Sequence, residues 1–397
     1  MSSDAASRPL TIMLVVGEPS GDQLGAQLMV GLKQLAGNRV RIVGVGGAAM
    51  IAEGLDSLFP LDATSVMGLR EVVPRIPAIL RRVREAADFA LQTRPDLVVL
   101  IDSPDFTHRI AQRIKRRDPS IRTANYPPPQ VWASRSYRAR KMARYMDAVL
   151  TFFPFEAAFF ERYGIHAINV GYPVIERASK IVGGREFRRR HAIALDAPLL
   201  AVLPGSRRNE IRFILPPFRA AVENLAREIP GLVCVVPTIA HVAPSVRAAV
   251  ANWPTPLHVV ETDAEKFAAF DAADVALAAS GTVTSELALA KTPMVVAYRV
   301  GWLTYALAKP FMHVPYMVLV NLVLGRKAIA EFEQYEGTPE ALVHALKPLL
   351  TDETARAKQI RDLEEGVRAF GMGQEAPSLR AARAVLELAS EVEPPSP

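Results

Sequence analysis

Short apolar runs alternate with amphipathic stretches along most of the chain. In the first half the apolar runs cover residues 11–16, 40–45, 97–101, 122–125, 148–152 and 167–170. Helical patterns separate them, most clearly over residues 23–35 and 74–92. Strands that alternate with helices in this way form parallel sheets with helices on both faces. The first half therefore predicts a doubly wound α/β unit.

The second half repeats the same plan. Its apolar runs cover residues 199–203, 232–236, 257–260, 275–278 and 294–298. Helices are expected over residues 214–228, 242–252, 266–272 and 284–290. A chain of 397 residues is too long for one ordinary core. We therefore predict an α/β protein of two Rossmann-like, doubly wound domains that face a central cleft.

The domain boundaries follow from the segments between and after these repeats. Residues 176–196 are strongly charged and contain Gly183 and Gly184, as expected of a linker with a short helix. The tail, residues 354–392, predicts one or two amphipathic helices. We expect a first domain of residues 1–175, completed by the helices of residues 354–392, and a second domain of residues 176–353.

Composition narrows the functional classes. Half of the residues are hydrophobic, which is typical of a packed globular protein. The net charge of +6 comes from 47 basic and 41 acidic residues. This bias could help the chain reach an anionic membrane or a phosphorylated substrate, and it is also common among cytoplasmic proteins. The basic clusters at residues 81–84, 115–117 and 188–190 lack interleaved aromatic residues, so they predict solvated helix faces and no nucleic-acid partner.

The sequence gives no sign of export or of a membrane span. Residues 1–9 lack the apolar segment of a secretory signal, and no run reaches 18 apolar residues. The single cysteine, Cys234, lies in an apolar run and is expected to be a buried thiol. We therefore expect a cytoplasmic protein. Residues 66–85 and 302–324 mix apolar residues with prolines, and they predict either core helices with loops or an interfacial patch that reaches lipid.

Two glycine-centred loops follow predicted strands and precede predicted helices. The first loop contains Gly17, Glu18, Ser20, Gly21 and Asp22. The second contains Gly205, Ser206 and Arg207. A strand, a tight loop and a helix in this order aim backbone N–H groups at the edge of a sheet, where an anion can bind without a metal. In the first loop, Ser20 and Asp22 could equally cap the helix.

A third turn has the same design. Ser280, Gly281 and Thr282 lead from a predicted strand into the helix at residues 284–290, whose N-terminus carries a partial positive charge. Arg207 adds a permanent cation that can bind two phosphate oxygens, unless it is an ordinary surface arginine. Glu286 falls in the first turn of the predicted helix, a position that the helix dipole favours for any glutamate.

Two carboxylates follow the most apolar strand. Asp102 and Asp105 flank Ser103 and Pro104 directly after residues 97–101, at the sheet edge where α/β proteins bind ligands. Asp102 is our candidate general base, and its alternative role is to accept hydrogen bonds from loop amides. Asp105 is better explained as a cap for the helix that follows. No metal site is expected, because this run lacks neighbouring ligands and the histidines show no ligand spacing.

These residues lie in segments that resemble the lipid-A-disaccharide synthase family, inverting glycosyltransferases of the GT-B architecture. The matching segments are GEPSGDQLGA (17–26), GVGGAAM (44–50), VMGLREV (66–72), IDSPDF (101–106), VWA (131–133), RKMARYMDAVLTFFPFE (140–156), LPGSRRNEI (203–211), ASGTVTSELAL (279–289), KTPMVVAYR (291–299) and LTYALAK (303–309). They follow the family order over nearly the whole chain. Each segment alone is weak, and the ordered set is specific.

The resemblance implies a reaction and a set of partners. The family transfers a diacylated glucosaminyl unit from UDP-2,3-diacylglucosamine to the 6-hydroxyl of 2,3-diacylglucosamine 1-phosphate, which gives a β-1,6-linked disaccharide and UDP in lipopolysaccharide biosynthesis. It implies no cofactor and no metal, and a peripheral location on the cytoplasmic face of the inner membrane. Members can pair by exchange of C-terminal segments, so a homodimer is an alternative to a monomer.

The resemblance also implies roles for the candidate residues. Arg207, Gly205, Ser206 and the turn at residues 280–282 would hold the UDP diphosphate, and Glu286 would bind the ribose hydroxyls. Asp102 would activate the acceptor hydroxyl, and the loop at residues 17–22 would serve the acceptor. Asn321, Gly325 and Arg326 match a third substrate-binding motif.

The chain departs from the family pattern at three places. Ser134 replaces the second of two tryptophans, Tyr172 replaces a histidine, and Lys327 replaces a glutamate. These changes leave open the acyl-chain preference and the identity of the acceptor. They also leave open an alternative, a non-catalytic or substrate-shifted paralogue that binds UDP-sugars or lipids.

Overall fold

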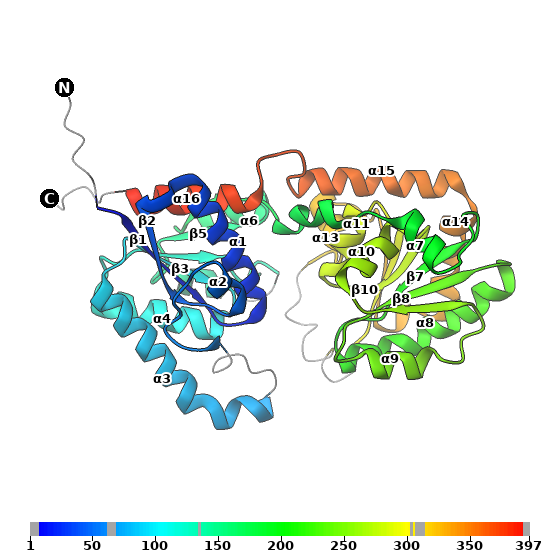
Figure 1. Cartoon of the computed structure of the whole chain (residues 1–397), viewed down its shortest axis with the longest axis horizontal. Helices are drawn as coiled ribbons and strands as arrows, with labels where there is room; N and C mark the ends of the chain where they lie inside the picture. Colours follow the sequence, from blue (N-terminus) through cyan, green and yellow to red (C-terminus); the bar gives the residue numbers. More distant parts are fainter. Residues whose placement is uncertain (1–7, 62–68, 134–135, 302–304, 306–313, 392–397) are drawn as a thin grey trace. The chain divides into compact units, whose positions relative to one another are not determined.

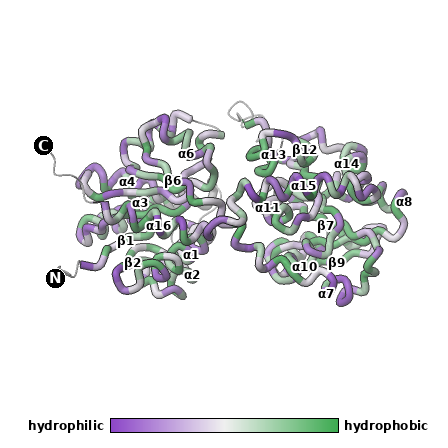
Figure 2. The backbone as a smooth tube through the Cα atoms, turned by 90° about the horizontal axis from the view of Figure 1, so that it is seen from above, coloured by the Kyte–Doolittle hydropathy of each residue, from purple (hydrophilic) through white to green (hydrophobic). Residues whose placement is uncertain are grey.

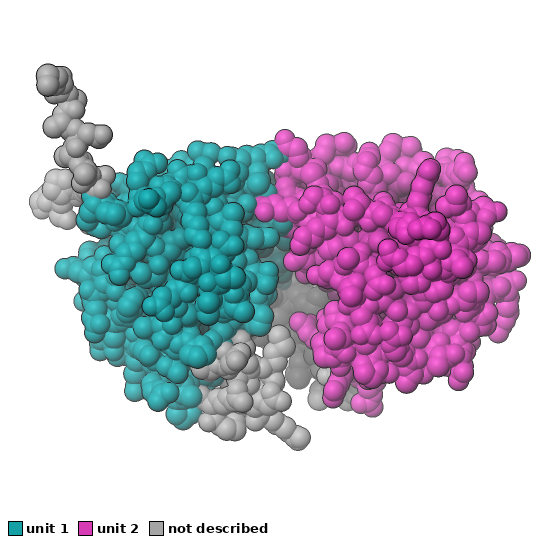
Figure 3. Space-filling view, in the orientation of Figure 1, with its two compact units in different colours: residues 1–173, 374–397 teal, residues 174–373 magenta. Residues whose placement is uncertain are grey.

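The protein consists of two compact α/β units. The structure is a computed structural model that describes all residues outside 1–7, 62–68, 134–135, 302–304, 306–313 and 392–397. Unit 1 contains residues 1–173 and 374–397, and unit 2 contains residues 174–373 (Figure 3). Residues 66–68 of the VMGLREV segment, all of the LTYALAK segment except Tyr305, and Ser134 lie outside the described residues.

Unit 1 is built on a six-stranded parallel sheet of order β2-β1-β3-β4-β5-β6 (Figure 1). The strands are β1 (Leu10–Val16), β2 (Val40–Val45), β3 (Leu97–Ile101), β4 (Thr123–Tyr126), β5 (Ala148–Thr151) and β6 (His166–Asn169). The helices are α1 (Pro19–Ala36), η1 (Gly37–Arg39), α2 (Ala48–Ala52), α3 (Leu69–Thr93), α4 (Pro104–Arg117), α5 (Tyr137–Met142), α6 (Pro154–Glu161) and α16 (Pro377–Ser390).

The apolar run of β1 is continuous because both faces of the sheet are buried. Met13 and Val15 pack in a core cluster with residues of α3 and α4. Ile12 and Leu14 pack in a second cluster with residues of α1 and α16. Successive side chains of a strand point to opposite faces, so a strand that is covered on both faces is apolar at every position. Figure 2 shows β1 as a largely hydrophobic segment.

Unit 2 contains a second parallel sheet, of order β12-β11-β10-β7-β8-β9. Its strands are β7 (Leu199–Leu203), β8 (Val233–Pro237), β9 (Leu257–Val260), β10 (Val275–Ala279), β11 (Met294–Tyr298) and β12 (Ala330–Glu333). Its helices are η3 (Pro173–Lys180), α7 (Gly184–Arg190), α8 (Arg208–Glu228), α9 (Ala243–Val250), α10 (Asp263–Ala272), α11 (Thr282–Leu289), α13 (Leu319–Leu324), η5 (Gln334–Glu336), α14 (Pro339–Thr351) and α15 (Glu353–Ala369).

Both sheets reverse their strand order at a central pair of strands. In unit 1 the chain runs from β1 to β2 on one side and then to β3 on the other side of β1. In unit 2 it runs from β7 to β8 and β9, and then to β10 on the other side of β7. Ligands of open α/β sheets bind beyond the carboxyl ends of strands at such switch points. The candidate loops follow β1, β3, β7 and β10, the four strands that flank the two switch points.

The structure corrects three expectations from the sequence. The tail does not belong to one unit, because α15 contacts α11, α13 and α14 in unit 2 while α16 packs on α1 in unit 1. The strand β12 was not predicted. Arg188 is not on a solvated face: it is buried, and its guanidinium donates to the carbonyl oxygens of Ala272 and Ala194.

Two other expectations are confirmed. Cys234 is buried in β8, where burial raises the pKa of its thiol to about 12. The expected doubly wound plan is present in both units.

Among the residues that the structure describes, no helix is both long enough and apolar enough to cross a bilayer.

Candidate active site

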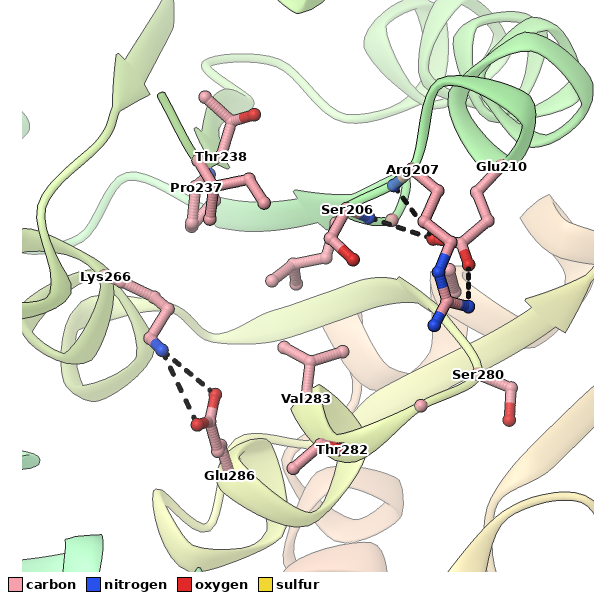
Figure 4. Close-up of a pocket in the computed structure, with 15 residues that line it drawn as sticks. Ser206, Arg207, Glu210, Pro237, Thr238, Lys266, Ser280, Thr282, Val283 and Glu286 are labelled. Carbon is pink, nitrogen blue, oxygen red and sulfur yellow. Dashed lines mark hydrogen bonds and ion pairs between the residues drawn. The ribbon is translucent and has the colours of Figure 1, made fainter. Parts of the chain in front are cut away.

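A cavity of about 320 Å³ lies at the switch point of unit 2. Figure 4 shows its walls, which come from the ends of β7, β8 and β10 and from the helices α10 and α11. Its lining residues are Leu203, Gly205, Ser206, Arg207, Glu210, Pro237, Thr238, Ile239, Lys266, Ala279, Ser280, Gly281, Thr282, Val283 and Glu286. The second glycine loop, the turn at residues 280–282 and Glu286 thus meet in one cavity.

Glu210 organises the second glycine loop. It lies one turn into α8, and its Oε2 accepts hydrogen bonds from the backbone N–H groups of Ser206 at 2.9 Å and Arg207 at 3.2 Å. Its Oε1 accepts from Nη1 of Arg207 at 3.0 Å. The amide of Ser206, which the sequence suggested as a phosphate donor, is therefore already bound, and so is that of Arg207. The side chain of Arg207 remains 69% exposed beside the cavity, so its guanidinium can reach a ligand.

The carboxylate can take this place only because residue 205 is glycine. Gly205 has a φ of +108°, and a β-carbon there would lie 2.5 Å from Oε2 of Glu210. Both the left-handed backbone and the close contact exclude a side chain. The sequence analysis missed Glu210, although its spacing of three residues from the N-cap residue Arg207 is that of a capping box.

Glu286 is a buried carboxylate held by two cations. It is 4% exposed, and its Oε2 lies 3.2 Å from Nζ of Lys266, while Arg177 forms a second, very short ion pair with Oε1. The sequence placed Glu286 in the first turn of its helix. Because α11 begins at Thr282, Glu286 instead belongs to the second turn. Neither Lys266 nor Arg177 was predicted, since only the tertiary fold brings them to Glu286.

The turn after β10 places a helix N-terminus at the cavity. Gly281 is the N-cap residue of α11, Thr282 begins the helix, and Ser280 donates from its hydroxyl to the carbonyl oxygen of Met317 at 3.5 Å. The first N–H groups of a helix have no acceptor within the helix and carry part of its positive dipole. This end of α11 can therefore bind an anionic group.

In unit 1 the first glycine loop supports Asp102. The hydroxyl of Ser20 donates to Oδ2 of Asp102 at 2.6 Å, and the backbone N–H of Ser103 donates to Oδ1 at 2.8 Å. The hydroxyl of Ser103 in turn donates to Glu18 at 3.3 Å. A β-carbon on Gly17 would lie 2.5 Å from that of Ser103, and one on Gly21 would lie 3.2 Å from that of Asp102. The glycines allow the two loops to touch.

The backbone at Asp102 is strained. Asp102 and Ser103 both lie in the left-handed region, with φ values of +56° and +44°. Non-glycine residues held in this region cost of order 1–3 kcal/mol each and cluster at functional sites. The bonds from Ser20 and the Ser103 amide hold the carboxylate in one orientation at the end of β3.

Two other acidic residues have different positions from those expected. Asp22 does not cap α1. It is buried and accepts hydrogen bonds from the N–H groups of Gly47, Ala49 and Met50, so it caps α2. Asp105 is exposed in the first turn of α4, and the N-cap position belongs to Ser103.

The third expected motif is not part of the cavity. Asn321 is buried, and its amide bonds to Ala328 and Ile329, which closes the segment between α13 and β12. Gly325 ends α13 with a φ of +64°, and Arg326 pairs with Asp362 and Glu365 of α15. The structure therefore gives these three residues contacts within unit 2 that do not involve the cavity lining.

The two described departures from the family pattern occupy different surroundings. Tyr172 packs against Phe152 and Phe153, with ring centroids 5.3 Å apart in both pairs. Lys327 is exposed and lies over the ring of Phe332 at 5.8 Å.

The described part of the chain contains no group of three or more His, Cys, Asp or Glu residues that could hold a metal ion. Two histidines that the sequence did not connect, His191 and His258, lie with their ring centroids 4.8 Å apart.

The fold is similar to those of several solved proteins. Solved structures of similar fold include the UDP-GlcNAc 2-epimerase from Neisseria meningitidis bound to UDP-GlcNAc (TM-score 0.59, 11% identity, 96% of this chain and 99% of that chain). MurG from Acinetobacter baumannii is also similar (TM-score 0.58, 14% identity, 96% and 100%). These likenesses support the predicted fold of two Rossmann-like units.

Sequence relatives are closer. The lipid-A-disaccharide synthase of Rhodospirillum centenum is 45% identical over 381 residues, which cover 96% of this chain and 95% of the relative. That of Bradyrhizobium diazoefficiens is 43% identical over 376 residues, covering 94% and 95%. The model of the lipid-A-disaccharide synthetase family matches residues 12–383. The chain therefore belongs to the lipid-A-disaccharide synthetase family.

Proposed function

We propose that the chain transfers a diacylglucosaminyl unit from UDP-2,3-diacylglucosamine to the 6-hydroxyl of 2,3-diacylglucosamine 1-phosphate. The observation that carries this proposal is the cavity of unit 2, where Arg207, the N-terminus of α11 and Glu286 line one space at a switch point. These groups suit a diphosphate and a ribose. Family membership supplies the chemistry of the two sugars.

In this proposal the backbone N–H groups of Ser206 and Arg207 do not bind the donor. Because Glu210 already accepts from the N–H groups of Ser206 and Arg207, the diphosphate binds the Arg207 guanidinium and the helix end at residues 280–282. Glu286 accepts hydrogen bonds from the ribose hydroxyls. An ionised carboxylate has about four acceptor sites, so the pairs with Lys266 and Arg177 leave capacity for a ligand.

Asp102 acts on the acceptor in this proposal. As the 6-hydroxyl attacks the anomeric carbon, Asp102 takes its proton, and the bond from the sugar to UDP breaks with inversion. The positive groups of unit 2 stabilise the negative charge that develops on the leaving diphosphate. A positioned base contributes about 10²–10⁴-fold to such a rate. The bonds from Ser20 and the Ser103 amide keep the carboxylate oriented.

The acyl chains of the substrates bear on where in the cell the protein works. We propose that the protein works at the cytoplasmic face of the inner membrane, because diacylated sugars partition into bilayers. The exposed Ile76 of α3 is an apolar residue available for such contact, with 44% of its surface accessible. Sedimentation with vesicles, with and without Ile76→Asp, tests this point.

The activity test uses purified protein, both diacylated substrates and EDTA, with the disaccharide measured by mass spectrometry. Asp102→Asn should lower kcat by about 100-fold or more while UDP binding stays unchanged, because only the base is lost. Asp105→Asn changes the neighbouring carboxylate and should leave kcat unchanged, because Asp105 takes no proton in this proposal. Loss of activity in Asp105→Asn with full activity in Asp102→Asn would assign the base to Asp105 instead.

Arg207→Ala tests the donor half of the proposal. It should weaken UDP binding by about tenfold or more, because charge-assisted bonds contribute about 1.5–3 kcal/mol. Arg208→Ala removes the neighbouring exposed cation, which does not line the cavity, and should leave binding unchanged. Equal effects of the two variants would contradict a specific role for Arg207. UDP binding without any disaccharide would favour a non-catalytic paralogue.

A further inference from the structure

Unit 1 contains a second cavity, of about 250 Å³, between α4, the segment after β4 and α5. Its lining residues are Pro104, Asp105, His108, Arg109, Gln112, Pro129, Val131, Arg138, Lys141, Met142 and Tyr145. Three of them are cations and one is a carboxylate. The cavity is smaller than the usual pocket for a drug-sized ligand, so it suits a compact polar group.

The positive charge of this cavity is not balanced. Among the described residues, Arg138 and Lys141 have no carboxylate oxygen within 4.0 Å, although nearby cations do: Lys115 pairs with Asp147, and Arg117 pairs with Asp88. Arg138 is also partly buried. Cations that line a concave site without a counter-ion attract an anion, because the low-dielectric walls focus their field.

The buried wall of the cavity contains His108. His108 accepts or donates hydrogen bonds at both ring nitrogens, with Asn125 at 3.0 Å and the Tyr145 hydroxyl at 3.3 Å. The pKa of His108 is lowered to about 4, mainly by burial; the hydrogen bond with Asn125 and the charge of Asp105 act against this shift, and the charge of Arg138 adds a smaller lowering. His108 therefore stays neutral at pH 7, and the cations at the mouth are left to bind the ligand.

We propose that this cavity binds a phosphate monoester through Arg138, Lys141 and Arg109, and that the ligand is the 1-phosphate of the acceptor. This assignment rests on the proposed function. Pro104 and Asp105, which line the cavity at the start of α4, follow the proposed base Asp102 by two and three residues in the chain.

The first glycine loop is a poorer place for that phosphate. Glu18 and Asp22 bring negative charge to the loop, and Ser20 already donates its hydroxyl hydrogen to Asp102. Like charges would repel a phosphate dianion. In the second cavity cations outnumber carboxylates, and their guanidinium and ammonium groups can donate hydrogen bonds to phosphate oxygens.

The test uses two double variants of the full chain with the same change in charge. Arg138→Gln with Lys141→Gln removes two cavity cations. Arg140→Gln with Arg144→Gln removes two exposed cations that do not line the cavity. Glucosamine 1-phosphate is titrated into each protein by calorimetry, with glucosamine as the phosphate-free control, and thermal unfolding checks that both variants fold.

The cavity variant should bind glucosamine 1-phosphate about tenfold or more weakly, and the control variant should bind like the wild type. In the transferase assay the cavity variant should raise KM for the acceptor, with kcat and UDP binding unchanged. Equal loss of binding in both variants would overturn the proposal, because it would show only the effect of net charge. Undiminished binding in the cavity variant would also overturn it.

Vesicles of phosphatidylglycerol distinguish a lipid headgroup from the acceptor. If the cavity variant loses vesicle binding but keeps its affinity for glucosamine 1-phosphate, the site belongs to a headgroup and the acceptor assignment is wrong. If the wild type binds glucosamine 1-phosphate through Arg138 and Lys141 but makes no disaccharide, the cavity assignment stands and the proposed function fails. The two proposals are thus tested separately.

Discussion

At the scale of residues, two carboxylates hold the cations around the cavity of unit 2. Glu210 pairs with Arg207, and Glu286 pairs with Lys266 and Arg177. Arg207 and Glu286 follow strand ends in readable motifs, and both line the cavity. Their roles in binding stay predictions. Glu210 has the spacing of a capping box, whereas Lys266 has no such signal, because an ion pair between α10 and α11 depends on how the helices pack. Asn321 matches a family motif, and in the structure its side chain bonds to Ala328 and Ile329.

Glu210→Gln tests the organisation of the second glycine loop. A glutamine has one acceptor oxygen, so it cannot bind the loop amides and Arg207 as the carboxylate does. We expect a loss of about 1 kcal/mol in the free energy of unfolding, since a charged cap and an exposed ion pair each contribute little. UDP binding should weaken less than in Arg207→Ala. Calorimetric titration with UDP and denaturant unfolding measure both effects. Tighter UDP binding would show instead that the carboxylate competes with the diphosphate.

At the scale of elements, apolar runs identify central strands and miss an edge strand. The predicted run at residues 97–101 is β3, all of whose residues are buried. β12 was not predicted because it lies at the edge of its sheet and its residues are only half-buried, with Glu331 and Glu333 alternating with Ala330 and Phe332. Helix starts were also placed too late. α1 begins at Pro19 and α8 at Arg208, because the polar first turns of both helices belong to the candidate loops.

The junction of α4 with β4 should make unit 1 sensitive to acid. His108 of α4 is neutral in the fold, with its pKa lowered from 6.5 to about 4, mainly by burial, and the charged groups around it are Asp105 and Arg138. The unfolded chain binds a proton at His108 below pH 6.5, and the folded chain does so only near pH 4. Stability is therefore lost as the pH falls from 6.5 to 4, by roughly 3 kcal/mol at most.

Denaturant unfolding of the wild type and of His108→Gln at several pH values measures this effect. Glutamine can still form a hydrogen bond to Asn125, but it does not titrate. The difference in unfolding free energy between the two proteins should change between pH 6.5 and 4 and stay constant above pH 7. A constant difference at all pH values would mean that His108 does not carry the acid sensitivity.

At the scale of the whole molecule, the chain returns to its first unit at the end. The amphipathic pattern of residues 354–392 predicted helices but could not say which core each helix covers, because any apolar stripe fits either sheet. In the structure α16 packs on α1, where Ala382 would lie 3.0 Å from a β-carbon on Gly31. Unit 1 thus depends on residues encoded after all of unit 2.

Removal of residues 374–397 should therefore destabilise unit 1 and spare unit 2. Val385 and Leu388 are buried in the core that contains Leu28 and Leu32 of α1, and together they contribute on the order of 3–6 kcal/mol. A domain has only about 5–15 kcal/mol of stability in total, so unit 1 should unfold or become sensitive to protease. Removal of residues 392–397 alone keeps α16 and is the control. UDP should still bind the truncated chain, because Arg207 and Glu286 lie in unit 2. Limited proteolysis measures the unfolding of unit 1, and calorimetric titration measures UDP binding by unit 2. Loss of UDP binding would show that unit 2 does not hold the nucleotide cavity by itself.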